Sequence, residues 1–278
     1  MPWDWGRIGL GLLLSLVISL TGYRMEALSG SGAIGATLVG TLTVGLGGWL
    51  WGWLLVVFFV SSSLLSRFRL AEKTAIQTHF AKGGRRDLGQ VLANGGLGAA
   101  LAAIAVLAPS ELIFAAYLGT LAAVNADTWA TELGVLSRQR PRLITTGRVV
   151  PAGTSGGVTA LGFVAALAGG LLIGLAAWTW AQVATLTGVP LAHEATWWPL
   201  WAAVGGWIGA LCDSLLGATV QATYWCDRCQ KETERAVHHC GTPTRRLRGW
   251  IWLSNDGVNF LCSLTGGLVT AAWALWWL

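Results

Sequence analysis

The chain has 278 residues, of which 54% are hydrophobic and only 11% are charged, and its formal net charge is +5. A soluble domain carries about 25% charged residues, so this composition excludes a water-soluble globule and a disordered chain alike. The 38 Gly have no period of three and there are only five Cys, which excludes a collagen-like chain and a disulfide scaffold. The chain is therefore predicted to be an all-α, polytopic membrane protein in which residues 1–278 form one integral membrane domain.

Apolar runs near the length of about 20 residues that spans a bilayer as a helix recur along the chain. The first, residues 8–20, is expected to be an uncleaved helix rather than a signal peptide, because no small-residue cleavage site follows it. Residues 33–66 are too long for one span and are expected to break near residues 45–48. Further spans are predicted at residues 88–107, 112–134, 157–180, 198–220 and 257–278. The prediction is about eight transmembrane helices, within a range of seven to nine.

Basic residues indicate how these helices are oriented. Sixteen of the 18 Lys and Arg lie in residues 67–86, 138–148 and 228–248, three loops that the predicted spans place on one side of the membrane. The positive-inside rule makes that side cytoplasmic, and Trp residues gather at the opposite helix ends, as amphipathic rings do at a membrane interface. We therefore predict a multi-pass protein of the cytoplasmic (inner) membrane with both termini outside. The positive charge is divided among three short loops, so it offers no case for nucleic-acid binding.

Four of the 13 carboxylates lie within or at the edge of apolar spans, namely Asp127, Glu132, Asp213 and Asp256. An ionisable group at membrane depth is costly, and it usually faces a cavity that carries function. One such group alone is as readily explained by a helix cap or a hydrogen bond to a neighbouring helix. Four of them toward the same side of the membrane favour a functional site.

Amide and hydroxyl side chains accompany these carboxylates in the segments 125–134 (NADTWATELG), 209–217 (GALCDSLLG) and 254–259 (SNDGVN). Small residues beside a carboxylate allow a ligand or another helix to approach closely. Carboxylate, amide and hydroxyl oxygens are hard ligands that suit Mg²⁺. The candidate Mg²⁺ ligands are Asn125, Asp127, Thr128, Asp213, Asp256 and Asn259.

Two segments are candidates for binding an anion. Residues 153–157 (GTSGG) stand where a loop enters a predicted helix, so backbone N–H groups and the helix dipole favour a phosphate there. Residues 82–87 (KGGRRD) supply arginines, whose planar fork of donors matches phosphate oxygens. The alternatives are glycine for helix packing and arginine for membrane topology. No Lys has the context of a P-loop, which excludes a P-loop kinase. The candidate nucleotide or phosphate ligands are Arg85, Arg86, Asn94, Gly153, Thr154, Ser155, Gly156, Gly157, Ser214 and Arg245.

The predicted cytoplasmic loop at residues 221–250 contains a second kind of site. A Cys-x2-Cys pair is followed about ten residues later by a His-His-Cys cluster. Because a reducing cytoplasm disfavours lasting disulfides, these residues predict either a structural Zn²⁺ site or free thiols. The candidate Zn²⁺ ligands are Cys226, Cys229, His239 and Cys240, with His238 as the alternative imidazole.

Four motifs in this order resemble the phytyl-phosphate kinase family of membrane proteins, which includes transmembrane protein 19. They are NADTWATELG at 125–134, GTSGGVTALG at 153–162, CDSLLGATVQ at 212–221 and NDGVN at 255–259. The resemblance spans roughly residues 82–265. More distantly, the chain is similar to phytol and dolichol kinases and to CDP-diacylglycerol synthases. The Cys/His loop cannot be carried over from all members of this family, so its interpretation rests on its own residues.

The resemblance implies an Mg²⁺-assisted kinase that acts on the cytoplasmic side. It would transfer a phosphoryl group from CTP or another nucleoside triphosphate to an isoprenoid monophosphate, such as phytyl or geranylgeranyl phosphate, giving the diphosphate. The residues implied in catalysis are Asp127, Glu132, Asp213, Asp256 and Arg85. A monophosphate acceptor, with a second pKa of about 6, needs no strong general base. Glu132 is therefore expected to be a ligand or a supporting group rather than a base.

Two other functions fit the same residues. A CTP-using lipid cytidylyltransferase would employ the same ions but release pyrophosphate and leave CMP on the lipid. A non-enzymatic lipid or ion transporter would explain buried carboxylates and glycine-rich helices without a nucleotide, although transporters generally place their polar site near the membrane midplane. The identity of the released product, CDP or pyrophosphate, separates the kinase from the cytidylyltransferase.

Overall fold

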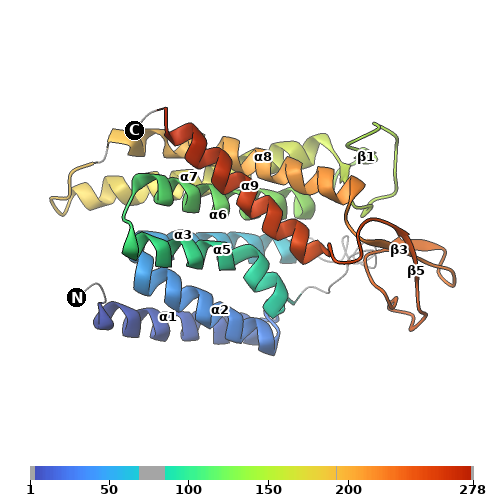
Figure 1. Cartoon of the computed structure of the whole chain (residues 1–278), viewed down its shortest axis with the longest axis horizontal. Helices are drawn as coiled ribbons and strands as arrows, with labels where there is room; N and C mark the ends of the chain where they lie inside the picture. Colours follow the sequence, from blue (N-terminus) through green and yellow to red (C-terminus); the bar gives the residue numbers. More distant parts are fainter. Residues whose placement is uncertain (1–3, 69–84, 192, 277–278) are drawn as a thin grey trace.

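A computed structural model of the chain describes residues 4–68, 85–191 and 193–276. Within these residues, eight α-helices form a bundle (Figure 1). Seven helices are long and apolar enough to cross a membrane, α6 being the one left out, which agrees with the predicted range of seven to nine spans. The helices are α1 (Trp5–Arg24), α2 (Gly30–Leu42), α3 (Trp49–Arg67), α5 (Leu88–Leu107), α6 (Glu111–Gly134), α7 (Ala160–Thr185), α8 (Trp198–Thr219) and α9 (Asn255–Ala274).

The long apolar stretch is broken where the sequence predicts it. A π-helical turn, Thr43–Gly47, follows α2, and α3 begins at Trp49. Between them Gly48 has a φ of +95°, a left-handed conformation that glycine adopts without strain. Nε of Arg7 donates a hydrogen bond of 3.0 Å to the carbonyl of Gly45, so α1 supports the irregular backbone at this break.

The α6 helix lies at the centre of the bundle and packs against α3, α5, α7, α8 and α9. Most of its residues from Phe114 to Ala126 are buried. Glycines let neighbouring backbones come very close. A Cβ on Gly119 would lie 2.3 Å from the carbonyl oxygen of Gly266, and a Cβ on Gly206 would lie 2.8 Å from that of Ala122. The helices α6, α7, α8 and α9 therefore form a dense group.

The segments that connect the helices are sorted into two ends of the bundle (Figure 1). Both termini lie at the left end of this view, and β1, β3 and β5 lie at the right end. We call the right end, with residues 85–87, 135–159 and 220–254, the loop end. The basic segments 138–148 and 228–248 both lie there, as predicted; Lys82 lies outside the described residues. That the loop end is cytoplasmic stays a prediction.

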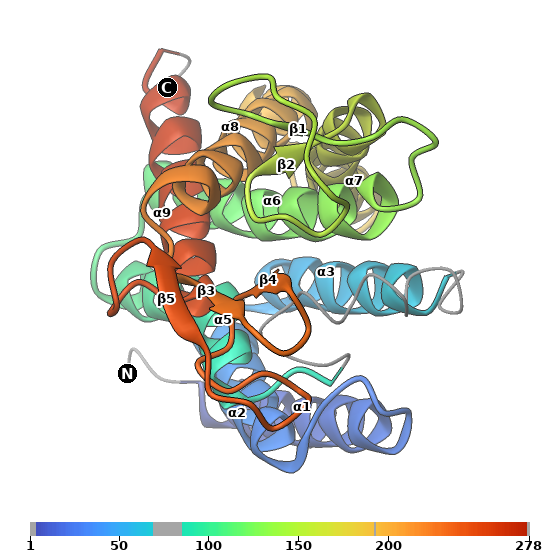
Figure 2. The ribbon, with the colours of Figure 1, turned by 90° about the vertical axis from the view of Figure 1, so that its right-hand side faces the viewer.

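Short strands at the loop end interrupt the otherwise helical fold and were not predicted. The strands β1 and β2 pair with each other in antiparallel orientation, and three others form an antiparallel sheet in the order β4-β3-β5. Figure 2 looks onto the loop end and shows both groups of strands in front of the helices. A 3-10 turn, His193–Trp197, precedes α8 at the other end. The strands are β1 (Arg142–Leu143), β2 (Gly157–Val158), β3 (Thr223–Cys226), β4 (Lys231–Thr233) and β5 (Arg245–Arg248).

Candidate functional site

The loop end of the bundle contains a polar cavity of about 890 Å³. Its walls come from α3, α5, α6, α7, α8 and α9 and from the segments around Arg86 and residues 152–159. This volume falls within the range of about 300–1,000 Å³ that small-molecule sites occupy. We refer to this space as the polar cavity.

The polar cavity gathers most of the residues that the sequence singles out. Members of all four motifs line it, although the motifs are far apart in the chain. The structure therefore brings these residues together, and their roles in binding and catalysis stay predictions. The predicted site residues that line the cavity are Arg85, Arg86, Asn94, Asp127, Thr128, Glu132, Gly153, Thr154, Ser155, Gly156, Gly157, Asp213, Ser214 and Asn259.

Asp127 on α6 and Asp213 on α8 form a pair of contacting carboxyl groups in the polar cavity. The two groups lie within hydrogen-bonding range of each other. Oδ1 of Asp213 is buried and has no hydrogen-bond partner among the described residues. The helices can come this close because their contact is made by small residues: a Cβ on Gly209 would lie 2.5 Å from the Cβ of Ala123. Two carboxylates in contact repel each other unless a proton or a cation lies with them, so this pair is suited to holding positive charge.

Arg86 and Glu132 supply charges of opposite sign to the same cavity. The backbone N–H of Arg86 donates to the carbonyl of Ala27 at 3.0 Å, and its Nη1 donates to Oγ of Ser63 at 3.1 Å. Oε1 of Glu132 accepts a hydrogen bond of 2.6 Å from Ser66. Burial lowers the pKa of Arg86, and the negative charge of Glu132 opposes that change. Since arginine keeps its charge in proteins, Arg86 is a half-buried cation that hydrogen bonds hold on the cavity wall.

The glycine turn at residues 153–157 lies against the end of α8. Gly153 and Gly156 have φ values of +85° and +80°, which favour glycine. A Cβ on Gly156 would also lie 2.5 Å from the backbone nitrogen of Ala218. The turn leads into α7, whose first turn is capped by the side chain of Thr159. The turn lies shortly before a helix, as predicted, but β2 and Thr159 separate it from the first turn of α7, which begins at Ala160 rather than at residue 157.

Asn125 is a predicted Mg²⁺ ligand that the structure places away from the cavity lining. It is fully buried. Its Oδ1 accepts a hydrogen bond of 3.0 Å from Ser61, and its Nδ2 donates one of 2.7 Å to the carbonyl of Gly169. The amide thus joins α3, α6 and α7, and these contacts explain its presence in an apolar span without a metal.

Arg245 and Asp256 also lie outside the residues that line the cavity. Arg245 sits on an exposed part of β5, where its Nε lies 3.2 Å from Oδ1 of Asp227. Asp256 is in the first turn of α9, beside Asn255 and Asn259, which do line the cavity. The geometry therefore supports Asn259 more directly than Asp256 as a group that faces a ligand.

Some lining residues were missed in the sequence. Ser63 and Ser66 lie one turn apart on α3 and face the cavity; a polar i, i+3 pair in an otherwise apolar helix is the signal that points to them. Gln90 lines the cavity from the same face of α5 as Asn94, which the sequence does predict, behind a capping box at Asp87. Glu234 reaches the cavity from the end of β4, and no local pattern predicts it.

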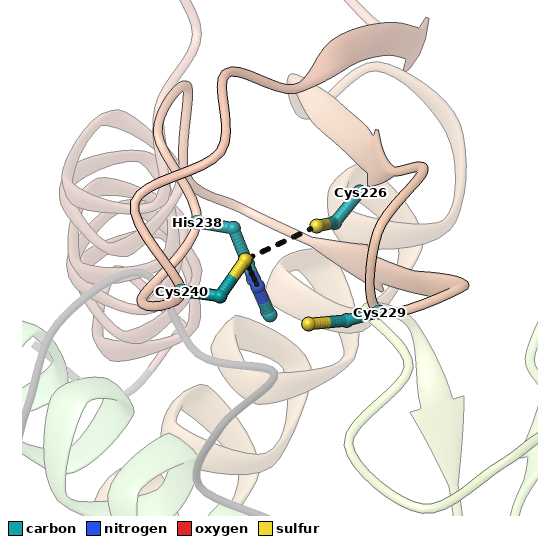
Figure 3. Close-up of side chains that lie close together, drawn as sticks. All are labelled: Cys226, Cys229, His238 and Cys240. Carbon is teal, nitrogen blue, oxygen red and sulfur yellow. Dashed lines mark hydrogen bonds between the residues drawn. The ribbon is translucent and has the colours of Figure 1, made fainter.

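The cysteine cluster lies beside the sheet at the loop end (Figure 3). One ligand atom from each of Cys226, Cys229, His238 and Cys240 lies within 4.8 Å of the others. The expected His239 is therefore corrected to His238: His238 is buried, whereas His239 is exposed. Close contacts with Thr242 and with His238 lower the pKa of the Cys240 thiol to about 5, while contact with Cys240 raises that of Cys229 to about 11.

Comparison with known proteins gives relatives along nearly the whole chain. Residues 13–267 match the family described as integral membrane protein DUF92. Protein PGR of Arabidopsis thaliana is 34% identical over 279 residues, which cover 95% of each chain. An uncharacterized membrane protein of Methanocaldococcus jannaschii is 32% identical over 95% of this chain and 92% of its own.

A more distant relative is the protein named VTE6, chloroplastic, of Arabidopsis thaliana, which is 26% identical over 88% of this chain and 65% of its own length. No solved structure matches the chain. These relations agree with the resemblance to the family of phytyl-phosphate kinases and transmembrane protein 19. The chain belongs to the DUF92 family of integral membrane proteins.

Proposed function

We propose that this protein is a membrane phosphotransferase that moves the terminal phosphoryl group of a nucleoside triphosphate, with CTP as the expected donor, to an isoprenoid monophosphate such as phytyl or geranylgeranyl phosphate. The observation that carries the proposal is the composition of the polar cavity. Two contacting carboxyl groups, a half-buried arginine held by hydrogen bonds and a glycine turn meet there, at one end of a membrane helix bundle. The family relation and the distant similarity to VTE6 support the same class of activity.

The carboxylates of Asp127 and Asp213 would hold Mg²⁺, with Asn259 and Thr128 as neighbouring oxygen donors. Their chemistry fits, because hard oxygen ligands suit this ion and because Oδ1 of Asp213 has no hydrogen-bond partner among the described residues. When bound, Mg²⁺ would neutralise charge on the phosphate oxygens that approach one another. Asn125 has no part in this assignment, since its amide is used between helices.

The remaining groups would position the phosphates. The guanidinium of Arg86 and the backbone N–H groups of Ser155 and Gly156 would be donors for phosphate oxygens. The N–H groups of Thr154 and Gly157 already donate to the carbonyls of Pro151 and Thr154. An oxygen of the acceptor phosphate attacks the terminal phosphorus, the bond to the bridging oxygen breaks, and the nucleoside diphosphate leaves. Glu132 accepts a hydrogen bond from Ser66 and is assigned a supporting role, because the acceptor phosphate needs no general base.

We assign the lipid tail to an apolar chamber next to the polar cavity. An apolar chamber of about 320 Å³ lies among α1, α2, α3 and α5, with Val39 and Phe58 in its wall. This chamber and the polar cavity share Arg86, Gln90 and Asn94. We assign the isoprenoid tail to the chamber and its phosphate to the shared residues, because this arrangement matches an apolar chain to an apolar wall and an anion to Arg86.

One reaction series tests the proposal. The purified protein is supplied with Mg²⁺, each of the four nucleoside triphosphates, and phytyl, geranylgeranyl or farnesyl monophosphate, and the lipid products are analysed by mass. The expected products are the isoprenoid diphosphate and a nucleoside diphosphate. Release of pyrophosphate with CMP on the lipid would establish the cytidylyltransferase instead. A folded protein that gives no product with any pair would contradict both enzymes and favour a transporter.

The side of the membrane that the polar cavity faces has its own test. We propose the cytoplasm, because the basic loops lie at this end and nucleotides are found there. Single cysteines at Thr154 and Thr187, in a background without reactive native thiols, should react with an impermeant reagent from opposite sides. Reaction of both from the outside of intact cells would overturn the topology.

A further inference from the structure

The cysteine cluster has the geometry of a tetrahedral metal site. The Sγ atoms of Cys226 and Cys240 lie 3.7 Å apart, and Nδ1 of His238 lies 3.3 Å from Sγ of Cys240. Metal–sulfur bonds of about 2.3 Å in a tetrahedron separate two sulfur atoms by about 3.8 Å. In Figure 3 the sulfur atoms of Cys226, Cys229 and Cys240 and the imidazole of His238 converge on one small space.

Two tight turns bring the four side chains together. Cys226 ends β3 and pairs with the first residue of β4, so Cys229 lies in the turn between the strands. That turn contains Gln230 with a φ of +51°, a left-handed conformation uncommon outside glycine. A second turn is closed by a hydrogen bond of 2.9 Å from the N–H of Gly241 to the carbonyl of His238. The chain is therefore folded back twice at the points where ligands are needed.

The imidazole of His238 gives an independent indication of a ligand. The residue is only 2% exposed, and it faces the thiols through Nδ1, the ring atom that lies 3.3 Å from Sγ of Cys240. Coordination through Nδ1 would fix the tautomer of the ring, with the proton on Nε2. A disulfide between Cys226 and Cys240 would leave both Cys229 and His238 unused.

The sheet beside the cluster holds the glycine turn of the polar cavity. Nη2 of Arg248, on β5, donates to Oε1 of Glu232 at 3.1 Å and to the carbonyl of Ser155 at 3.3 Å. Oγ of Ser155 donates to Oε1 of Gln221 at 3.1 Å, and Nε2 of Gln221 donates to Glu234 at 2.7 Å. These bonds connect the strands directly to residues 153–157.

Such short strands cannot stabilise themselves. The three strands have 4, 3 and 4 residues, too few to bury a core, and units of this size generally depend on a metal or disulfides. We propose that Cys226, Cys229, His238 and Cys240 bind one structural Zn²⁺, which holds the sheet together and through Arg248 and Gln221 fixes the glycine turn. This proposal does not depend on the reaction that the cavity catalyses.

Metal content tests whether the four residues bind zinc. The full chain is purified in detergent without a His-tag, and zinc and protein are measured together. We expect one zinc per chain in the wild type and in His239→Ala, and loss of zinc in Cys226→Ser and His238→Ala. A wild type without zinc whose three loop thiols react under native conditions, or one with a Cys226–Cys240 disulfide, would overturn the site, as would full zinc in Cys226→Ser.

Cobalt substitution covers the case in which the cysteine variants do not fold. Wild-type protein stripped with a chelator and reloaded with Co²⁺ should show thiolate-to-cobalt charge-transfer bands and the visible bands of a tetrahedral ion. Absence of these bands in a protein that remains folded would exclude the cluster as a tetrahedral thiolate site.

Hydrogen exchange tests whether the bound zinc fixes the glycine turn. Backbone amides of residues 153–158 should exchange at least about tenfold faster after zinc removal, a difference of about 1.4 kcal/mol in the opening free energy. Arg248→Gln should speed the same amides while the zinc content stays at one per chain. Unchanged exchange in both samples would show that the metal does not act on the glycine turn.

Discussion

The two groups of helices in this bundle are packed differently. Within α6, α7, α8 and α9, glycine and alanine bring backbones into direct contact; a Cβ on Gly174 would lie 2.5 Å from Cα of Pro199. The helices α1, α2, α3 and α5 also have close contacts, such as that between Gly40 and Ser15, but they leave an apolar chamber of about 320 Å³. The first group carries the paired carboxyls, and the second carries the apolar chamber that we assign to the tail.

This difference fits what each part of the proposed reaction needs. Phosphoryl transfer depends on groups fixed to within a fraction of an ångström, and dense small-residue packing supplies that rigidity. An isoprenoid tail needs only an apolar wall of adequate length, because hydrophobic contact is not directional. The two requirements meet at Arg86, which belongs to the linings of both spaces.

The largest effect is expected from the paired carboxyls. Asp127→Asn and Asp213→Asn each remove a charge but little volume, so activity should fall at least about a hundredfold, or about 2.7 kcal/mol of barrier, while the melting temperature stays within a few degrees. Asp256→Asn, outside the lining residues, is the matched control and should lose less than about tenfold. Equal losses in all three would mean that Asp256 belongs to the site as much as the pair does.

Arg86 should show the next largest effect. Arg86→Lys keeps the charge but loses the planar fork and the bond to Ser63, so kcat/KM should fall about thirtyfold, mostly through KM for the monophosphate. Arg85→Lys is the control, since Arg85 is half exposed and pairs with Glu26 at the surface; its kcat/KM should change less than about threefold. A reversed order would move the phosphate to the mouth of the cavity.

Most of the helical fold could be predicted because the bilayer imposes a length and an apolar composition on each span. The break before α3 could be predicted because glycines interrupt an apolar stretch. Asp127 and Asp213 could be identified as candidate site residues by the same logic, since a carboxylate at membrane depth is costly and usually has a function. These inferences use only local sequence and one property of the solvent.

The parts that escaped prediction depend on contacts between distant segments. The sheet at the loop end forms from strands as short as three residues, which are too short to show an alternating apolar pattern in the sequence. His238 and His239 are neighbours in the sequence, and only the folded turn determines that His238 is buried and His239 is exposed. The apolar chamber arises from how four helices fit together, and no single helix face indicates it. Arg245 was predicted at the site, whereas Arg248, three residues further along β5, donates to the carbonyl of Ser155 in the glycine turn.

The glycine turn, which lies against the end of α8, tests the role of the densely packed group of helices. Gly156→Ala adds a Cβ that would lie 2.5 Å from the backbone of Ala218 and strains a φ of +80°, so activity should fall about tenfold and stability by roughly 1–2 kcal/mol. Gly147→Ala is the control: it has a φ of +68° but nothing within 4 Å of its Cβ. It should share the loss of stability from backbone strain and keep nearly full activity. Full activity in Gly156→Ala would show that the turn does not position a phosphate.

The apolar chamber gives the smallest and most selective effect. Val56 lines the chamber from α3, so Val56→Trp should fill part of it and raise KM for geranylgeranyl phosphate about fivefold, a cost of about 1 kcal/mol, comparable to one buried CH₂. Dimethylallyl phosphate is too short to depend on the chamber, so its kcat/KM should change less than about twofold. Val60→Trp, one turn further along α3 at a residue that is 46% exposed, is the matched control and should leave both substrates unaffected. The ratio of the two KM values isolates the tail from the phosphate, because any disturbance of Arg86 or the carboxyl pair would affect both substrates equally. A Val56→Trp enzyme with an unchanged ratio would place the tail outside the chamber, against the surrounding lipid, while leaving the phosphotransferase proposal intact.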